Sequence, residues 1–121
     1  MTQYNGQTLA YLGDAIYELL VREYLLSKGI TKPINLHDEA VKYTCAEGQY
    51  KRLSIIEHNL TEEELSVLKR GRNGNISRKA RNVDLKTYQY ATGLEALFGY
   101  LYLDNNMDRI RELFNLMTAN D

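Results

Sequence analysis

Apolar residues recur along most of this chain at steps of three and four, the spacing that places side chains on one face of a helix. The first such segment, residues 9–21 (LAYLGDAIYELLV), contains only two charged residues, Asp14 and Glu18. Its apolar stripe consists of Leu9, Leu12, Ile16, Leu19 and Leu20. Because apolar residues also flank Asp14 on the opposite side, the pattern predicts a helix that is buried on nearly every face.

A second apolar segment, residues 90–103 (YATGLEALFGYLYL), carries a single charge, Glu95. A carboxylate among apolar side chains needs hydrogen bonds, a cation or water to stay charged. A bond to a tyrosine or a backbone amide is the ordinary solution for such a residue. Two such acids in one chain suggest another: if the two helices pack together, Asp14 and Glu95 come within reach of one divalent ion with oxygen ligands.

Capping signals predict where the helices begin and end. Asn5 or Thr8 caps the first helix, which runs to about Ser27 and stops at Lys28-Gly29. The second predicted helix spans Leu36 to about Glu57, with Asn35 as its cap. A bend is possible at Gly48, because glycine weakens a helix interior.

Three further helices complete the pattern. Thr61 and Glu64 form a capping box at the start of a short helix, and Asp84 caps the helix that contains Glu95. The last helix carries an apolar face made of Ile110, Leu113, Phe114 and Met117. We find no alternating pattern typical of strands, so the sequence predicts an all-α fold.

Composition limits the class of protein. The 121 residues suit one domain, 1–121, and the net charge of −1 excludes nucleic-acid binding through overall charge alone. The single cysteine, Cys45, excludes an internal disulfide and is expected in the core. With no leader and no apolar run long enough to span a bilayer, we expect a soluble, cytoplasmic protein.

Positive charge is concentrated between residues 69 and 82, a stretch with no acidic residue. Six of the fifteen lysines and arginines lie there: Lys69, Arg70, Arg72, Arg78, Lys79 and Arg81. Such a segment suits the phosphates of RNA, whose contacts weaken as salt rises. The alternative is a solvated loop that is balanced by the acidic residues 62–64.

Two motifs give the chain a family resemblance. Leu12-Gly13-Asp14-Ala15, followed by Leu94-Glu95-Ala96-Leu97-Phe98-Gly99 and then Tyr102-Leu103-Asp104, resembles the two-part signature of the ribonuclease III catalytic domain. The segments LAYLGDAIYE, Thr31-Lys32-Pro33 with Leu36-His37, Leu68 to Asn73, and Tyr88 to Tyr102 resemble more closely the Mini-ribonuclease III subfamily, which lacks the appended double-stranded RNA-binding domain. The resemblance covers about residues 7 to 117.

This resemblance implies a homodimeric helical bundle that acts as a Mg²⁺-dependent endonuclease on double-stranded RNA, with precursor large-subunit (23S) ribosomal RNA as the subfamily's substrate. It makes Asp14 and Glu95 the catalytic, metal-binding acids and implies 5′-phosphate ends on the products. The resemblance also implies a large-subunit ribosomal protein as a partner that assists cleavage.

The chain departs from the full-length family pattern at two positions, because Ala10 and Thr92 stand where longer members have acids. We therefore expect Glu18, one turn beyond Asp14, as a candidate third metal ligand; pairing with Arg22 is its ordinary alternative. The reduced number of acids leaves a second function open, an inert dimeric RNA-binding or ribosome-associated module of the same fold. A helical protein-interaction domain is a third reading.

Overall fold

The computed structural model describes residues 4–74 and 84–121. Within these ranges the chain is helical and contains no strand, which confirms the predicted all-α class. The elements are α1 (Gly6–Ser27), α2 (Pro33–Thr44), α3 (Ala46–Ile56), the 3₁₀ turn η1 (Glu57–Asn59), α4 (Glu62–Arg72), α5 (Leu85–Leu103) and α6 (Met107–Thr118).

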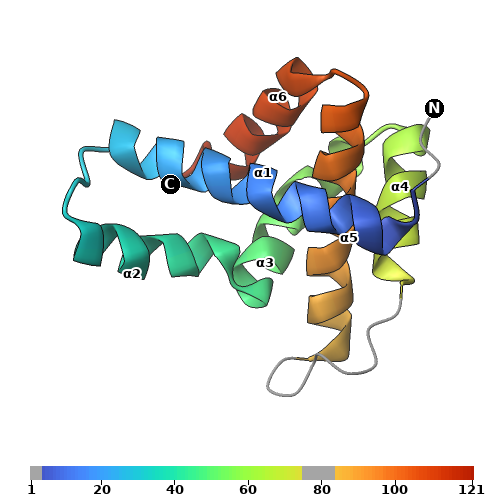
Figure 1. Cartoon of the computed structure of the whole chain (residues 1–121), viewed down its shortest axis with the longest axis horizontal. Helices are drawn as coiled ribbons and strands as arrows, with labels where there is room; N and C mark the ends of the chain where they lie inside the picture. The colour runs from blue at the N-terminus through green and yellow to red at the C-terminus, as the bar shows by residue number, and fades with distance from the viewer. Residues whose placement is uncertain (1–3, 75–83) are drawn as a thin grey trace.

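Helix α5 is the centre of the bundle and packs against α1, α3, α4 and α6. In Figure 1 the long α1 crosses in front of α5, while α4 lies beside it and α6 folds back above it. The uninterrupted run from Ala96 to Leu101 is buried, as expected for a helix covered on several sides. Within 4–74 and 84–121, neither α5 nor any other helix is long and apolar enough to cross a membrane.

The predicted ends of α1 are confirmed. The Oδ1 atom of Asn5 accepts a hydrogen bond from the backbone N–H of Thr8 at 2.8 Å, which makes Asn5 the cap. At the other end, Lys28 is the C-cap residue, and Gly29 after it adopts a φ of +88°. Glycine reaches this left-handed conformation without strain, so the chain can reverse toward α2.

The segment predicted as one helix from Leu36 to Glu57 is two helices, and this prediction was wrong. The break lies at Cys45, whose extended backbone (φ −69°, ψ 159°) ends α2, and whose Sγ accepts a hydrogen bond from the Gly48 N–H at 3.4 Å to start α3. Cys45 is therefore exposed at a helix start and not in the core. The predicted cap Asn35 was also wrong: α2 begins at Pro33, which suits the first helical position.

The capping box at α4 is confirmed and is tied to α6. Thr61 Oγ1 accepts from the Glu64 N–H at 3.1 Å, and Glu64 Oε1 accepts from the Thr61 N–H at 2.9 Å. The same carboxylate receives two hydrogen bonds of 2.8 Å from Arg109 on α6. The pKa of Glu64 lies below its usual value, chiefly because of these charge-assisted bonds.

Aromatic rings fill the space where α1, α5 and α6 meet. The ring of Tyr17 lies 5.9 Å from that of Phe98 and 6.1 Å from that of Phe114. Its hydroxyl donates to the backbone carbonyl of Tyr43 at 2.9 Å, so no polar atom is left unpaired by this burial. The apolar face predicted for α6 is confirmed, because Ile110, Leu113, Phe114 and Met117 are all buried.

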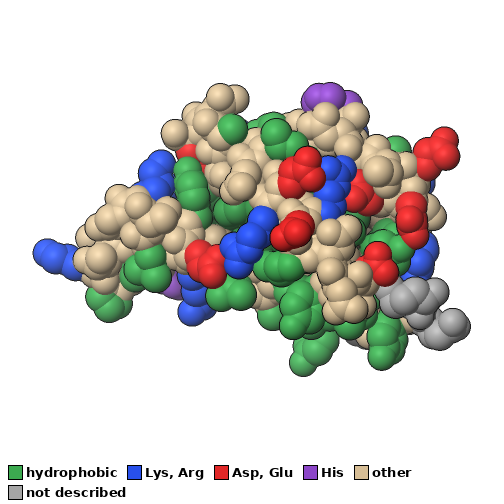
Figure 2. Space-filling view, turned by 90° about the horizontal axis from the view of Figure 1, so that it is seen from above, with side chains coloured by type: hydrophobic (Ala, Val, Ile, Leu, Met, Phe, Trp, Pro, Cys, Tyr) green, Lys and Arg blue, Asp and Glu red, His purple; other side chains and the backbone are tan. Residues whose placement is uncertain are grey.

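One side of α1 is open in the single chain, contrary to the expectation of a helix buried all round. Tyr11 is 85% exposed and Leu19 is 50% exposed, so Leu19 does not belong to the core stripe. Asp14, three residues after Tyr11, is exposed as well. In Figure 2 hydrophobic side chains gather along the lower edge, the side that faces the viewer in Figure 1, where α1 lies in front. The chain therefore leaves an apolar surface along α1 without cover.

Candidate functional site

The candidate site forms where α1 crosses α5, and glycines allow the two helices to approach closely. A Cβ atom on Gly99 of α5 would lie 2.1 Å from the carbonyl oxygen of Leu9, and Gly13 of α1 meets the backbone of α5 in the same way. Side chains at these positions would hold the two backbones apart. The crossing places Asp14, the residue after Gly13, beside Glu95.

Asp14 and Glu95 lie together at this crossing, as the sequence predicted, while their role as metal-binding catalytic acids stays a prediction. Glu95 is half-buried and Asp14 is exposed, so the pair opens to solvent from α1's side. Burial, the largest cause, raises the pKa of Glu95 to about 8, and the charge of Asp14 and a hydrogen bond with it act in the same direction. A proton between two carboxyl groups relieves their repulsion in the absence of a cation.

A third polar side chain reaches this pair from α3, and the sequence analysis missed it. Gln49 is only 3% exposed, and its Nε2 donates a hydrogen bond to Glu95 Oε2 at 3.1 Å. This bond opposes the rise in the pKa of Glu95, because an N–H group favours the charged carboxylate. A polar residue between the apolar residues of a helix was the available signal.

Ala10 and Thr92, the two positions where longer family members have acids, supply no carboxylate to a metal ion. Ala10 is buried and apolar, and the Thr92 hydroxyl donates to the carbonyl of Tyr88 in its own helix at 3.1 Å. Glu18 accepts a hydrogen bond from Arg22 at 3.5 Å, the ordinary alternative for this residue. Among residues 4–74 and 84–121, no three acids, histidines or cysteines gather into a metal cluster. A metal role for Glu18 stays a prediction.

The basic segment is described only in part. Lys69, Arg70 and Arg72 lie in the last turn of α4, while the predicted RNA-binding residues Arg78, Lys79 and Arg81 fall outside the described residues. Lys69 is exposed. The other two have contacts within the chain: Arg70 donates to the carbonyl of Tyr4 at 2.5 Å, and Arg72 donates to the Tyr90 hydroxyl at 3.2 Å. All three charges lie at the same end of α4.

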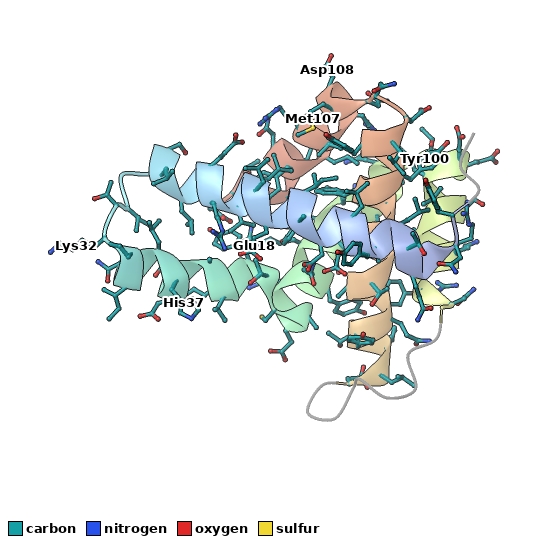
Figure 3. The ribbon with its side chains drawn as sticks, viewed as in Figure 1. Glu18, Lys32, His37, Tyr100, Met107 and Asp108 are labelled. Atoms are coloured by element: carbon teal, nitrogen blue, oxygen red, sulfur yellow. The ribbon has the colours of Figure 1, made fainter. Side chains whose placement is uncertain are left out.

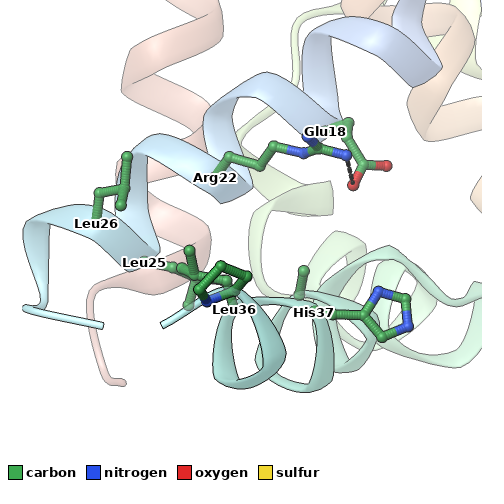
Figure 4. Close-up of a pocket in the computed structure, with 8 residues that line it drawn as sticks. Glu18, Arg22, Leu25, Leu26, Leu36 and His37 are labelled. Carbon is green, nitrogen blue, oxygen red and sulfur yellow. Dashed lines mark hydrogen bonds and ion pairs between the residues drawn. The ribbon is translucent and has the colours of Figure 1, made fainter. Parts of the chain in front are cut away.

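A hollow of about 380 Å³ lies between the second half of α1 and the first half of α2. Its floor is mostly aliphatic, and the Glu18–Arg22 pair stands at its rim opposite His37 (Figure 4). The lining residues are Glu18, Arg22, Leu25, Leu26, Pro33, Leu36, His37 and Ala40. Figure 3 shows Glu18 and His37 on facing helices, away from α4.

Comparison with known proteins gives three findings. Residues 7–106 match the model of the ribonuclease III domain. The chain is 45% identical over 111 residues to Mini-ribonuclease 3 of Streptococcus pneumoniae, covering 90% of this chain and 87% of that protein, and 47% identical over 115 residues to Mini-ribonuclease 3 of Enterococcus faecalis, covering 93% and 87%. A crystal structure of a Fusobacterium nucleatum protein matches with a TM-score of 0.84 at 36% identity, covering 94% of this chain and 92% of that one.

Proposed function

We propose that this chain, which belongs to the ribonuclease III family and is an endoribonuclease of double-stranded RNA, cuts its substrate with Mg²⁺ held by Asp14 and Glu95. We propose further that it acts as a homodimer in the cytoplasm and matures precursor large-subunit (23S) ribosomal RNA. The observation that carries the proposal is the meeting of Asp14 and Glu95 at the crossing of α1 and α5.

The donor chemistry of the pair fits a magnesium ion. Mg²⁺ prefers oxygen ligands and keeps several waters, so two carboxylates suffice when water and a substrate phosphate complete the coordination. The raised pKa of Glu95 supports this assignment, because a divalent cation would replace the proton and remove the repulsion from Asp14. The open side of Asp14 gives a phosphate access to the pair.

When bound, the ion would supply an activated water and stabilise charge on the phosphoryl oxygens. The residues of the chain would bind the ion and hold its ligands in position. Asp14 and Glu95 supply the negative ligands, and the glycines of the crossing hold their backbones together. By family kinship the products carry 5′-phosphate ends.

The end of α4 suits the RNA backbone. Duplex RNA presents phosphates and 2′-hydroxyls across a shallow minor groove, so a protein reads its shape more than its sequence. Lys69, Arg70 and Arg72 supply positive charge, and the contact between Arg72 and Tyr90 joins this charge to α5, the helix that carries Glu95. Arg78, Lys79 and Arg81 belong to the same proposed RNA-binding segment.

A homodimer would cover the open side of α1. Exposed Tyr11 lies in the first half of this helix, and the hollow beside Leu25 and Leu26 lies about 20 Å further along it, at 1.5 Å per residue. A two-fold axis between them would bring Tyr11 of each protomer to its partner's hollow, which makes a self-complementary interface. Two active sites on one symmetric surface suit the two antiparallel strands of a duplex. A large-subunit ribosomal protein could present the RNA to this surface.

Cleavage of duplex RNA tests the proposal. We expect wild-type protein with Mg²⁺ to cut a radiolabelled precursor ribosomal RNA helix, and Glu95→Gln to bind the same RNA without cutting it. Equal cleavage with and without a chelator would refute the metal assignment. If the protein cuts generic duplexes but not the ribosomal helix, precursor ribosomal RNA is not its substrate.

A further inference from the structure

Gln49 is a polar side chain in the interior of the bundle, and the one hydrogen-bond partner described for its amide is Glu95 of the proposed active site. It is 3% exposed, and its Nε2 atom lies 3.1 Å from Glu95 Oε2. Burying an amide costs free energy unless its hydrogen bonds are made, and most interior positions of this size hold apolar residues. The position therefore calls for an explanation beyond packing.

The surrounding backbone fixes where Gln49 points. A Cβ atom on the preceding residue, Gly48, would lie 2.1 Å from the carbonyl oxygen of Lys42, so the start of α3 is pressed against the end of α2. The next residue, Tyr50, packs its ring 5.4 Å from that of Tyr90 on α5. The first contact fixes α3 against the end of α2 and the second packs it on α5, and between them the Gln49 amide meets Glu95.

No other described neighbour supplies Glu95 with a neutral donor. Ala10 has no polar side-chain atom, and the Thr92 hydroxyl donates its proton to the backbone carbonyl of Tyr88. Asp14 presents a like charge when both acids are ionised. An amide N–H can only donate, so its bond to Oε2 persists when Glu95 is ionised and leaves the other oxygen available to a cation.

We propose that Gln49 is a positioning residue of the active site, which fixes Glu95 as a ready, oriented metal ligand through its amide N–H. The inference rests on the proposed function above. In metal sites, residues that orient a ligand typically change metal affinity or activity by about 10- to 100-fold when they are lost.

Gln49→Met tests the proposal, because methionine has a similar length and suits a buried site but cannot donate to Glu95. We expect the Mg²⁺ concentration for half-maximal cleavage to rise at least about ten-fold. The KM for RNA should stay unchanged, and excess Mg²⁺ should restore kcat. We also expect Mg²⁺ to raise the melting temperature of the wild-type protein, a readout that needs no catalysis, and Gln49→Met should need correspondingly more ion for the same rise.

Thr118→Val is the matched control, since it also removes a buried polar group, the hydroxyl that donates to Phe114 on α6 at 3.0 Å. It should leave the Mg²⁺ midpoint unchanged whatever it costs in stability. If Gln49→Met shows the wild-type midpoint and the wild-type melting shift, Gln49 is a packing residue and the proposal is overturned. If wild-type protein shows no Mg²⁺-dependent cleavage, the proposed function fails instead.

A measurement on wild-type protein covers the case in which Gln49→Met does not fold. We expect Mg²⁺, without RNA, to shift the side-chain amide NMR signals of Gln49 at the concentrations that support cleavage. The signals of Gln89, on the first half of α5, serve as the reference and should move less. An unmoved Gln49 amide at saturating Mg²⁺ would overturn the proposal.

Discussion

Gly13 packs directly against the backbone of Glu95: a Cβ atom on Gly13 would lie 1.6 Å from the Glu95 carbonyl oxygen. No rotation of a side chain relieves this overlap, because the obstructing atom belongs to the backbone of a buried helix. The same contact brings Asp14 beside the Glu95 side chain. The close packing of α1 on α5 therefore also brings the acid pair together.

Gly13→Ala should separate the two helices and disturb the pair. We expect a loss of unfolding free energy of about 2 kcal/mol or more, within or above the usual range for overpacking, together with loss of cleavage. Urea unfolding and a duplex cleavage assay measure the two effects. Ala15→Ser, on the exposed side of the same helix, is the control and should change neither by much. A stability change below about 0.5 kcal/mol for Gly13→Ala would show that the crossing adjusts easily.

The raised pKa of Glu95 predicts how stability depends on pH in metal-free protein. Its folded pKa of about 8 exceeds the unfolded value of 4.5, so the folded state binds the extra proton, and this contribution to stability falls as pH rises between these values. Glu95→Gln removes the charge and keeps an oxygen that accepts from Gln49. Between pH 5 and pH 8.5, the unfolding free energy of the variant should therefore rise relative to that of wild type by on the order of 1–2 kcal/mol. This is less than the full pKa shift implies, because Glu95 is partly in water.

Chemical denaturation with EDTA at several pH values measures this gain. A constant difference in unfolding free energy between Glu95→Gln and wild type across this pH range would show that the folded protein does not raise the pKa of Glu95. Mg²⁺ should reduce the difference at pH 8.5, since the ion relieves the repulsion only in wild type.

Lys69 tests the RNA-binding segment most cleanly, because it is exposed at the end of α4 and its replacement should not disturb the fold. Lys69→Ala should weaken binding of duplex RNA and lower the slope of log K against log salt by about 1. Arg72→Ala should do the same and also cost stability, because Arg72 bonds to Tyr90 and stacks over its ring at 5.3 Å.

The control for this pair is Lys32→Ala, which removes an exposed charge at the start of α2, at the far end of the molecule (Figure 3). It should leave the salt slope near that of wild type. If all three variants keep the wild-type slope, the end of α4 faces solvent in the complex and the RNA lies elsewhere.

Tyr11 tests the proposed dimer. Its ring is 85% exposed in the single chain, and the interface would bury it. Tyr11→Asp should shift the protein to monomers in sedimentation or light-scattering measurements, because an unpaired charge in an apolar contact is costly. Tyr102→Asp, which changes another exposed tyrosine, should leave the dimer intact. A wild-type monomer, or a dimer that Tyr11→Asp does not weaken, would contradict the α1 interface.

The helical elements follow largely from local chemistry, which is why sequence predicted most of them. Asn5 and the Thr61–Glu64 box act within one turn, and the apolar face of α6 repeats at short intervals. The break at Cys45 was missed because the flanking residues continue a helical pattern. Cys45 caps α3 with its Sγ, a role rarely expected of a cysteine, and Gly48 then lies close to the Lys42 carbonyl across the break.

The acid pair was predictable and its surroundings were not. Two isolated acids in apolar helices are visible in one sequence, and the pairing of Asp14 with Glu95 follows from the family motifs. The solvent exposure of Asp14 and Leu19 was missed because apolar residues on all sides of α1 suggested full burial. Gln49 was missed because an amide in a mixed helix gives no sign of the distant residue it contacts.

The central claim is that Asp14 and Glu95 hold a divalent ion that cuts duplex RNA. Cleavage of a defined duplex by wild-type protein and Asp14→Asn, with and without Mg²⁺ and read at nucleotide resolution, tests it most directly. The account predicts Mg²⁺-dependent cuts by wild type, and none by Asp14→Asn, which should bind the RNA as well or more tightly because it has lost a negative charge. Undiminished cleavage by Asp14→Asn would contradict the account, as would wild-type binding that never leads to a cut.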